Sequence, residues 1–90
     1  MTRLERVAQA LAIRPMLWTK LNEYQRLILR GRFNNQSYAA LGETIIRSNS
    51  TTLIKRSEEW TVRQVLHLEK VAIQLDRMGM GWRWDKNGKS

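Results

Sequence analysis

The sequence has little from which a disulfide framework or a membrane segment could be built. It contains no cysteine, which excludes disulfide bonds and thiolate metal sites. Its apolar runs are only a few residues long, as at residues 27–29, so no segment is predicted to span a bilayer. The first residues carry two arginines but no apolar core of signal-peptide length. We therefore expect a cytoplasmic protein without a membrane partner.

The residues from which active sites are usually built are also scarce. The chain has one histidine, His67, and eight Asp and Glu residues that are scattered along it. Glu58 and Glu59 are adjacent, so a helix would point them to different sides and they make a poor acid–base pair. No phosphate-binding glycine loop is present. We expect a protein that works by binding, with no enzyme activity, no cofactor and no metal.

Positive charge is the most prominent feature of the composition. Sixteen Lys and Arg residues oppose eight Asp and Glu residues, which gives a net charge of +8 on 90 residues. A domain this small and basic is attracted to polyanions, and nucleic acid is the commonest of these in the cytoplasm. Arg also outnumbers Lys, and its planar fork suits phosphates and guanine edges.

The chain has one proline, five glycines and apolar residues at helical spacing, a combination that predicts an all-α fold. Thr2 and Glu5 form a capping-box pattern for a first helix that ends before Pro15. A second helix is predicted over residues 20–30, with Gly31 as its C-terminal cap. Ser37 is the predicted N-cap of a third, short helix. The expected architecture is a small bundle of four to five helices.

The last helical stretch allows two interpretations. Thr61 and Gln64 form a second capping-box pattern, and Trp60 with Val65 would supply its hydrophobic staple. This pattern predicts a fourth helix over residues 50–59 and a fifth over 62–78, whereas one continuous helix is the alternative. We assign residues 1–78 to a helical domain and residues 79–90 to an irregular tail that contains tryptophan.

Two short helices joined by a tight turn are the arrangement of a helix-turn-helix, whose second helix enters the major groove. The second helix is predicted to begin near residues 48–50 with small polar side chains, which suit contacts to phosphates and base edges. Lys55 and Arg56 follow one turn later. Between Tyr24 and Ser57 there are six Lys and Arg residues and only one acid, Glu43.

A set of aliphatic, basic, aromatic and small polar residues recurs through residues 21–56 in a characteristic order. It consists of Leu21, Gln25, Arg26, Ile28, Leu29, Arg32, Phe33, Ser37, Tyr38, Leu41, Ile45, Ser48 and Thr51. With these residues the segment resembles region four of bacterial sigma factors and the DNA-binding segment of phage late-gene regulators, including Q-type antiterminators. The chain differs from the family at the turn, where Ile46 stands in place of the usual glycine and Arg47 in place of an aliphatic residue.

This resemblance implies a DNA-binding transcriptional regulator of phage or prophage origin. RNA polymerase or another host protein and a second copy of the chain are further partners that it implies. Double-stranded DNA would be read in the major groove. Predicted phosphate contacts are Arg26, Arg30, Arg32, Arg47 and Arg56. Predicted base contacts are Asn49, Ser50, Thr52 and Lys55.

The tail supports a rival hypothesis. Trp82 and Trp84 either dock on the helical core or form an aromatic anchor for a partner. In the second case the protein would be a small phage inhibitor or adaptor that binds a host protein complex through its helical surface and its tail.

Overall fold

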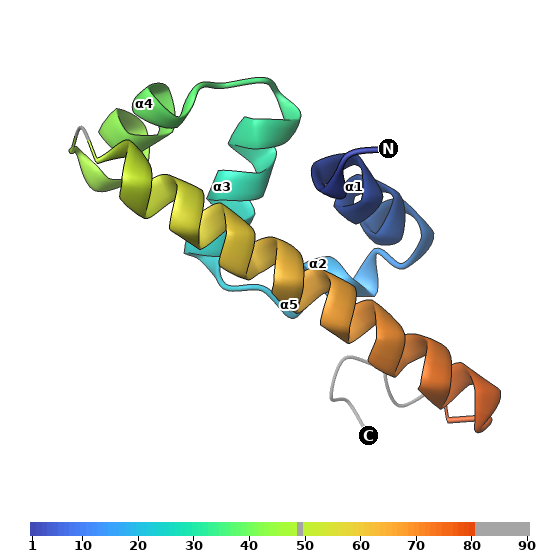
Figure 1. Cartoon of the computed structure of the whole chain (residues 1–90). Coiled ribbons are helices and arrows are strands. Elements are labelled where there is room, and N and C mark those ends of the chain that lie inside the picture. The colour runs from blue at the N-terminus through green and yellow to red at the C-terminus, as the bar shows by residue number, and fades with distance from the viewer. Residues whose placement is uncertain (49, 81–90) are drawn as a thin grey trace.

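Helices form most of the computed structural model, which describes residues 1–48 and 50–80 (Figure 1). No strand occurs in these two ranges. The all-α prediction is therefore confirmed. In chain order the elements are α1 (Arg3–Ile13), α2 (Met16–Thr19), α3 (Glu23–Phe33), α4 (Tyr38–Leu41), the wider π-helical turn η1 (Gly42–Ile46) and α5 (Thr51–Arg77).

The first helix begins and ends where the sequence predicts. The hydroxyl of Thr2 accepts the backbone N–H of Glu5 at 3.1 Å, and the Glu5 carboxylate accepts the N–H of Thr2 at 2.9 Å. The helix ends at Ile13, two residues before Pro15. Its two fully buried residues, Val7 and Ala10, are three apart and so lie on one face.

Helix α3 corresponds to the helix predicted over residues 20–30, and it continues past the residue that was predicted to end it. Its N-cap is Asn22, whose side chain forms a capping box with Gln25, and the helix runs through Gly31 to Phe33. Gly31 is therefore not a C-terminal cap, and that prediction is wrong. A Cβ at Gly31 would collide with the side chain of Leu41, so this glycine instead allows α4 to pack closely on α3.

The fifth helix is continuous over 27 residues, which corresponds to about 40 Å. The predicted break after residue 59 is wrong, and the alternative of one helix is confirmed. The Thr61 hydroxyl donates to the carbonyl of Ser57 at 2.7 Å, so it binds the preceding turn instead of capping a new helix. Trp60 is 67% exposed and does not form the predicted staple with Val65.

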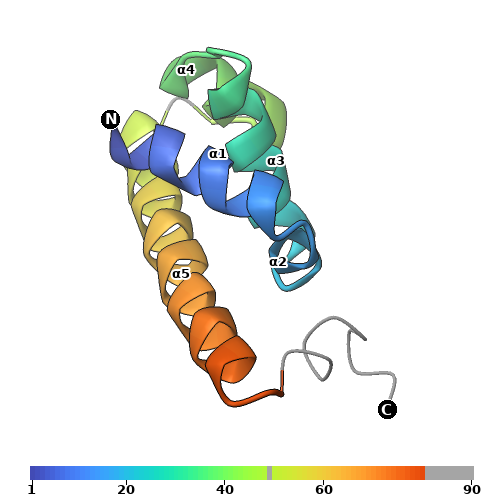
Figure 2. The same ribbon diagram turned by 90° about the vertical axis from the view of Figure 1, so that its right-hand side faces the viewer.

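The core lies along one side of α5. This helix contacts α1, α2, α3, α4 and η1. Figure 2 shows α1 and α3 on the same side of it. The main cluster of buried apolar residues consists of Val7, Ala10, Leu17, Leu21, Leu29, Val62 and Val65. Three further residues, Ile28 of α3, Leu41 of α4 and Ile54 of α5, are also almost completely buried.

Two ionic contacts tie the first helix to the fifth along their length. Arg6 binds Glu69 with an N–O distance of 2.8 Å, and Arg14 binds Asp76 at 2.7 Å. None of the helices in the described ranges is long and apolar enough to cross a membrane. Trp82 and Trp84 lie outside the described residues, so the two hypotheses for the tail stay predictions.

Candidate nucleic-acid interface

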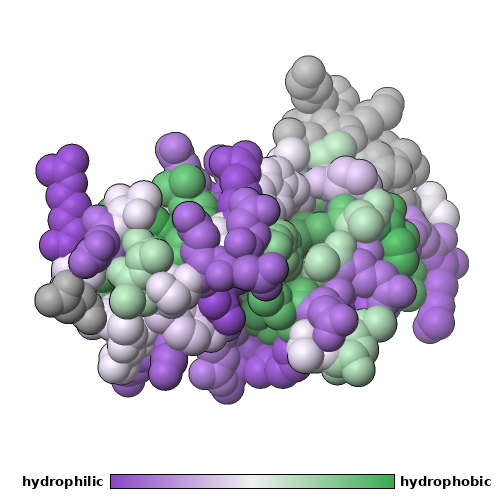
Figure 3. Space-filling model, turned by 90° about the horizontal axis from the view of Figure 1, so that it is seen from above, coloured by the Kyte–Doolittle hydropathy of each residue, from purple (hydrophilic) through white to green (hydrophobic). Residues whose placement is uncertain are grey.

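Two consecutive helical segments and a tight turn form one end of the molecule, at the upper left of Figure 1. The Ser37 hydroxyl accepts the N–H of Ala40 at 3.1 Å and so caps α4, as predicted. The Ser50 hydroxyl accepts the N–H of Leu53 at 3.3 Å and caps α5. The predicted helix start near residues 48–50 is therefore confirmed. Seen from above, this end shows mainly hydrophilic and neutral residues (Figure 3).

The turn between these segments is made by Gly42 and Arg47. Arg47 has the left-handed backbone angles φ 52° and ψ 43°, which end η1. The N–H of Ser48 donates to the carbonyl of Gly42, six residues earlier, at 3.1 Å and closes the end of η1. A Cβ at Gly42 would lie 2.7 Å from the carbonyl oxygen of Ser48, so only glycine fits. The resemblance places the turn glycine at Ile46. In the structure the residue with left-handed backbone angles is the next one, Arg47.

Glu58 fixes the position of α4 relative to α3 and α5. Its carboxylate accepts the Nε–H of Arg32 at 2.7 Å and the hydroxyl of Tyr38 at 2.9 Å. The Arg32 guanidinium also lies 4.2 Å from the centre of the Tyr38 ring and donates to the carbonyl of Gln36 at 2.7 Å. Only 23% of the Arg32 side chain is exposed. Arg32, predicted as a phosphate contact, therefore has a structural role.

The same cluster perturbs the titration of Tyr38. Burial of the phenol raises the pKa of Tyr38, and the hydrogen bond to the Glu58 carboxylate raises it further. The charge of Arg32 opposes this change in the pKa. Tyr38 therefore stays protonated and keeps donating to Glu58 well into the alkaline range.

Two further polar contacts hold α3 against α5. The hydroxyls of Tyr24 and Ser57 are 3.1 Å apart, and the Gln25 amide donates to Gln64 at 2.7 Å. Gln25 is buried, and its pairing with Gln64 satisfies a polar group that would otherwise destabilise the core. Polar side-chain hydrogen bonds, as well as apolar packing, thus fix the orientation of α5 relative to α3.

Several of the predicted contact residues come together at the start of α5. Arg47, Thr52, Lys55 and Arg56 are all exposed, and Ser50 is half-buried because its hydroxyl caps the helix. Thr52 lies one helical turn before Lys55 and Arg56, so the three side chains share a face. The ammonium group of Lys55 lies 5.3 Å from the Tyr38 ring centre. Asn49 lies outside the described residues.

Two predicted contacts lie elsewhere. Arg26 donates to the carbonyl of Trp18 at 3.5 Å, and the Arg30 guanidinium lies 5.4 Å from the centre of the Trp18 ring. Both side chains therefore point from α3 toward α2. The structure does not bring them together with the cations at the start of α5.

One basic residue at this end was missed by sequence reasoning. Arg3, at the start of α1, lines a hollow of about 290 Å³ together with Tyr38, Lys55 and Val62. Arg3 and Lys55 are far apart in the chain, and no local pattern connects them. Their proximity follows from the packing of α1 on α5, which sequence periodicity alone does not give.

Comparison of the chain with known protein families, with curated proteins and with solved structures found no significant match.

Proposed function

We propose that the protein binds double-stranded DNA by inserting the N-terminal turns of α5 into the major groove. The observation that carries this proposal is the exposed group of Arg47, Thr52, Lys55 and Arg56 around a capped helix start that follows a tight turn. This is the arrangement by which helix-turn-helix proteins present a reading helix. The nearby carboxylate of Glu58 is occupied by Arg32 and Tyr38, which limits its repulsion of phosphate.

Different residues take different roles in this complex. Arg47 and Arg56 bind phosphates on either side of the groove, and Arg3 adds a phosphate contact from α1. Thr52 and Lys55 face the base edges, where a hydroxyl can donate or accept and an ammonium group binds guanine acceptors. The free N–H groups at the start of α5 favour a nearby phosphate. The further role in phage transcription rests on the resemblance to sigma region four.

The salt dependence of binding to a random-sequence duplex of roughly 30 base pairs, about three helical turns, tests this proposal. The three proposed phosphate contacts, Arg3, Arg47 and Arg56, predict that log affinity falls with log salt at a slope of about −2.7. The double variant Arg47→Gln, Lys55→Gln should reduce the steepness by about one, because Arg47 is the one phosphate contact that it removes, and the loss of Lys55 from the base edges should lower the affinity further.

A matched variant provides the control. Lys70 and Arg77 are exposed on the distant part of α5, so Lys70→Gln, Arg77→Gln removes the same charge far from the proposed groove. This variant should keep the wild-type slope and affinity. Equal losses from both double variants would mean that net charge, and not this interface, drives binding.

A further inference from the structure

The outer face of α5 carries a continuous exposed stripe along most of the helix. Its members recur at intervals of three and four residues, which places them on one face. All of them are exposed. We call it the Trp60 stripe, and it consists of Arg56, Trp60, Arg63, His67, Lys70, Gln74 and Arg77.

The charge on this stripe is entirely of one sign. Four of its members are Arg or Lys, and none is acidic. Arg63 pairs with Glu59 beside the stripe at 3.0 Å, but both side chains are more than half exposed, so the pair is weak. The ion pairs of Glu69 and Asp76 are directed toward Arg6 on α1 and Arg14 at its C-terminal cap. The stripe therefore attracts anionic groups.

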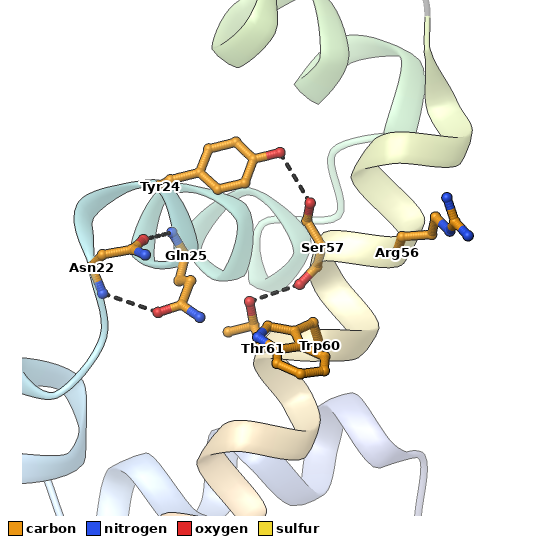
Figure 4. A pocket seen from close by; sticks show the side chains of 7 residues that line it. All are labelled: Asn22, Tyr24, Gln25, Arg56, Ser57, Trp60 and Thr61. Carbon is orange, nitrogen blue, oxygen red and sulfur yellow. Dashed lines mark hydrogen bonds between the residues drawn. The ribbon is translucent and has the colours of Figure 1, made fainter.

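Trp60 gives the stripe an apolar anchor. Hollows adjoin its indole on several sides. One, of about 370 Å³, lies toward Tyr24 and Gln25, and Figure 4 shows the indole beside Thr61 at its edge. Another, of about 300 Å³, is lined largely by carbon and lies between Trp60, Arg63, Gln64 and His67. Tryptophan is one of the residues that most often carry binding energy at protein interfaces.

The proposed DNA complex leaves most of this stripe unused. At 1.5 Å per residue, Trp60 lies about 13 Å and Arg77 about 39 Å along α5 from Thr51. The major groove is only about 8.5 Å deep and 12 Å wide. The straight helix has therefore left the groove by Trp60, and Lys70 and Arg77 lie beyond it.

We propose that the Trp60 stripe binds an acidic segment of a partner protein, with an aliphatic or aromatic side chain seated against Trp60. Carboxylates of this segment would pair with Lys70 and Arg77. A protein fits better than a single nucleic-acid strand, because strand-binding surfaces stack successive bases on several aromatic rings, whereas this stripe has one. The proposal does not depend on DNA binding, although the helix would allow both partners at once.

Titration with a synthetic peptide of Glu and Asp interspersed with Leu and Phe tests the proposal. The readout is the indole N–H resonance of Trp60, assigned from its loss in Trp60→Phe, together with the affinity from calorimetry. We expect the peptide to shift this resonance. Trp60→Ala should weaken binding by at least about tenfold, as for a central anchor. Lys70→Gln, Arg77→Gln should weaken binding and flatten its salt dependence.

Controls separate this surface from the DNA interface. Arg47→Gln, Lys55→Gln should bind the peptide as the wild type does, even though it loses duplex DNA. Trp60 is exposed, so thermal melting should show that Trp60→Ala folds normally. The proposal is overturned if the peptide binds Trp60→Ala with unchanged affinity, or if it fails to shift the Trp60 resonance. It is also overturned if only a deoxythymidine oligonucleotide shifts that resonance, or if Lys70→Gln, Arg77→Gln loses duplex binding as strongly as the groove variant.

Discussion

Replacing Arg47 by glycine should raise stability and lower DNA affinity at the same time. Arg47 has φ 52° and ψ 43°, a left-handed conformation that costs an L residue roughly 1–2 kcal/mol because of its Cβ. Glycine avoids this cost but loses about 0.4–1 kcal/mol more chain entropy on folding. The net gain is therefore about 0.5–1 kcal/mol. For a domain of this size, it corresponds to a rise in Tm of about 2–8 °C.

Thermal melting and duplex titration measure the two effects separately. Arg47→Gly should melt at a higher temperature, because no described contact of the exposed Arg47 side chain stabilises the fold. The same variant should bind duplex DNA with a salt slope less steep by about 0.9, because one phosphate contact is lost. Arg47→Ala is the matched control, since it removes the cation but keeps the Cβ. It should show the same loss of binding without the gain in stability.

Two results would contradict this reasoning. If Arg47→Gly and Arg47→Ala change Tm equally, the left-handed conformation does not limit stability at the turn. If both variants bind DNA as the wild type does, Arg47 is not a phosphate contact, and the proposed orientation of the turn on DNA is wrong.

Further predictions concern the packing and the polar cluster behind the turn. Gly31→Ala should destabilise the fold by up to about 2 kcal/mol in urea unfolding, because overpacking against Leu41 costs about 1–3 kcal/mol and the gain in helix propensity returns about 1 kcal/mol. Glu58→Gln should cost about 1.5–3 kcal/mol by the same assay, since it weakens the bonds to Arg32 and Tyr38. The folded-state pKa of Tyr38 is raised, so its contribution is complete below its unfolded pKa near 10 and is lost as pH rises through the folded pKa. Unfolding at about pH 9 and about pH 11 should therefore show a larger alkaline loss in the wild type than in Tyr38→Phe.

Three helix starts were predictable because their signals are local. Thr2, Ser37 and Ser50 each cap a helix by accepting a backbone N–H from the residue three positions later. Both partners of each interaction are therefore found within four consecutive residues of the sequence. The predicted end at Gly31 failed because its role depends on Leu41, which is distant in the chain. The predicted break at Thr61 failed because a threonine hydroxyl inside a helix can bond to the preceding turn instead of capping a new one.

The candidate interface was predictable only where it is continuous in sequence. Lys55 and Arg56 were found because they follow the capped start of a helix. Arg32 was taken for a phosphate contact because its partner Glu58 lies on another helix, and only packing brings them to 2.7 Å. Arg3 was missed for the same reason. The Trp60 stripe became visible only when α5 proved continuous, because a break would have interrupted its spacing.

The dependence of the earlier helices on α5 has a consequence for synthesis at the ribosome. Helices α1, α2, α3 and α4 all pack on α5, which is the last of the helices in the described ranges. At about 5–20 residues per second, roughly one to five seconds pass while α5 is made. During this interval the apolar faces around Val7, Leu17 and Leu29 lack the part of the core that α5 contributes through Val62 and Val65. The nascent chain is therefore most vulnerable to aggregation and to chaperone capture shortly before it can fold, and folding must follow the release of α5 from the exit tunnel.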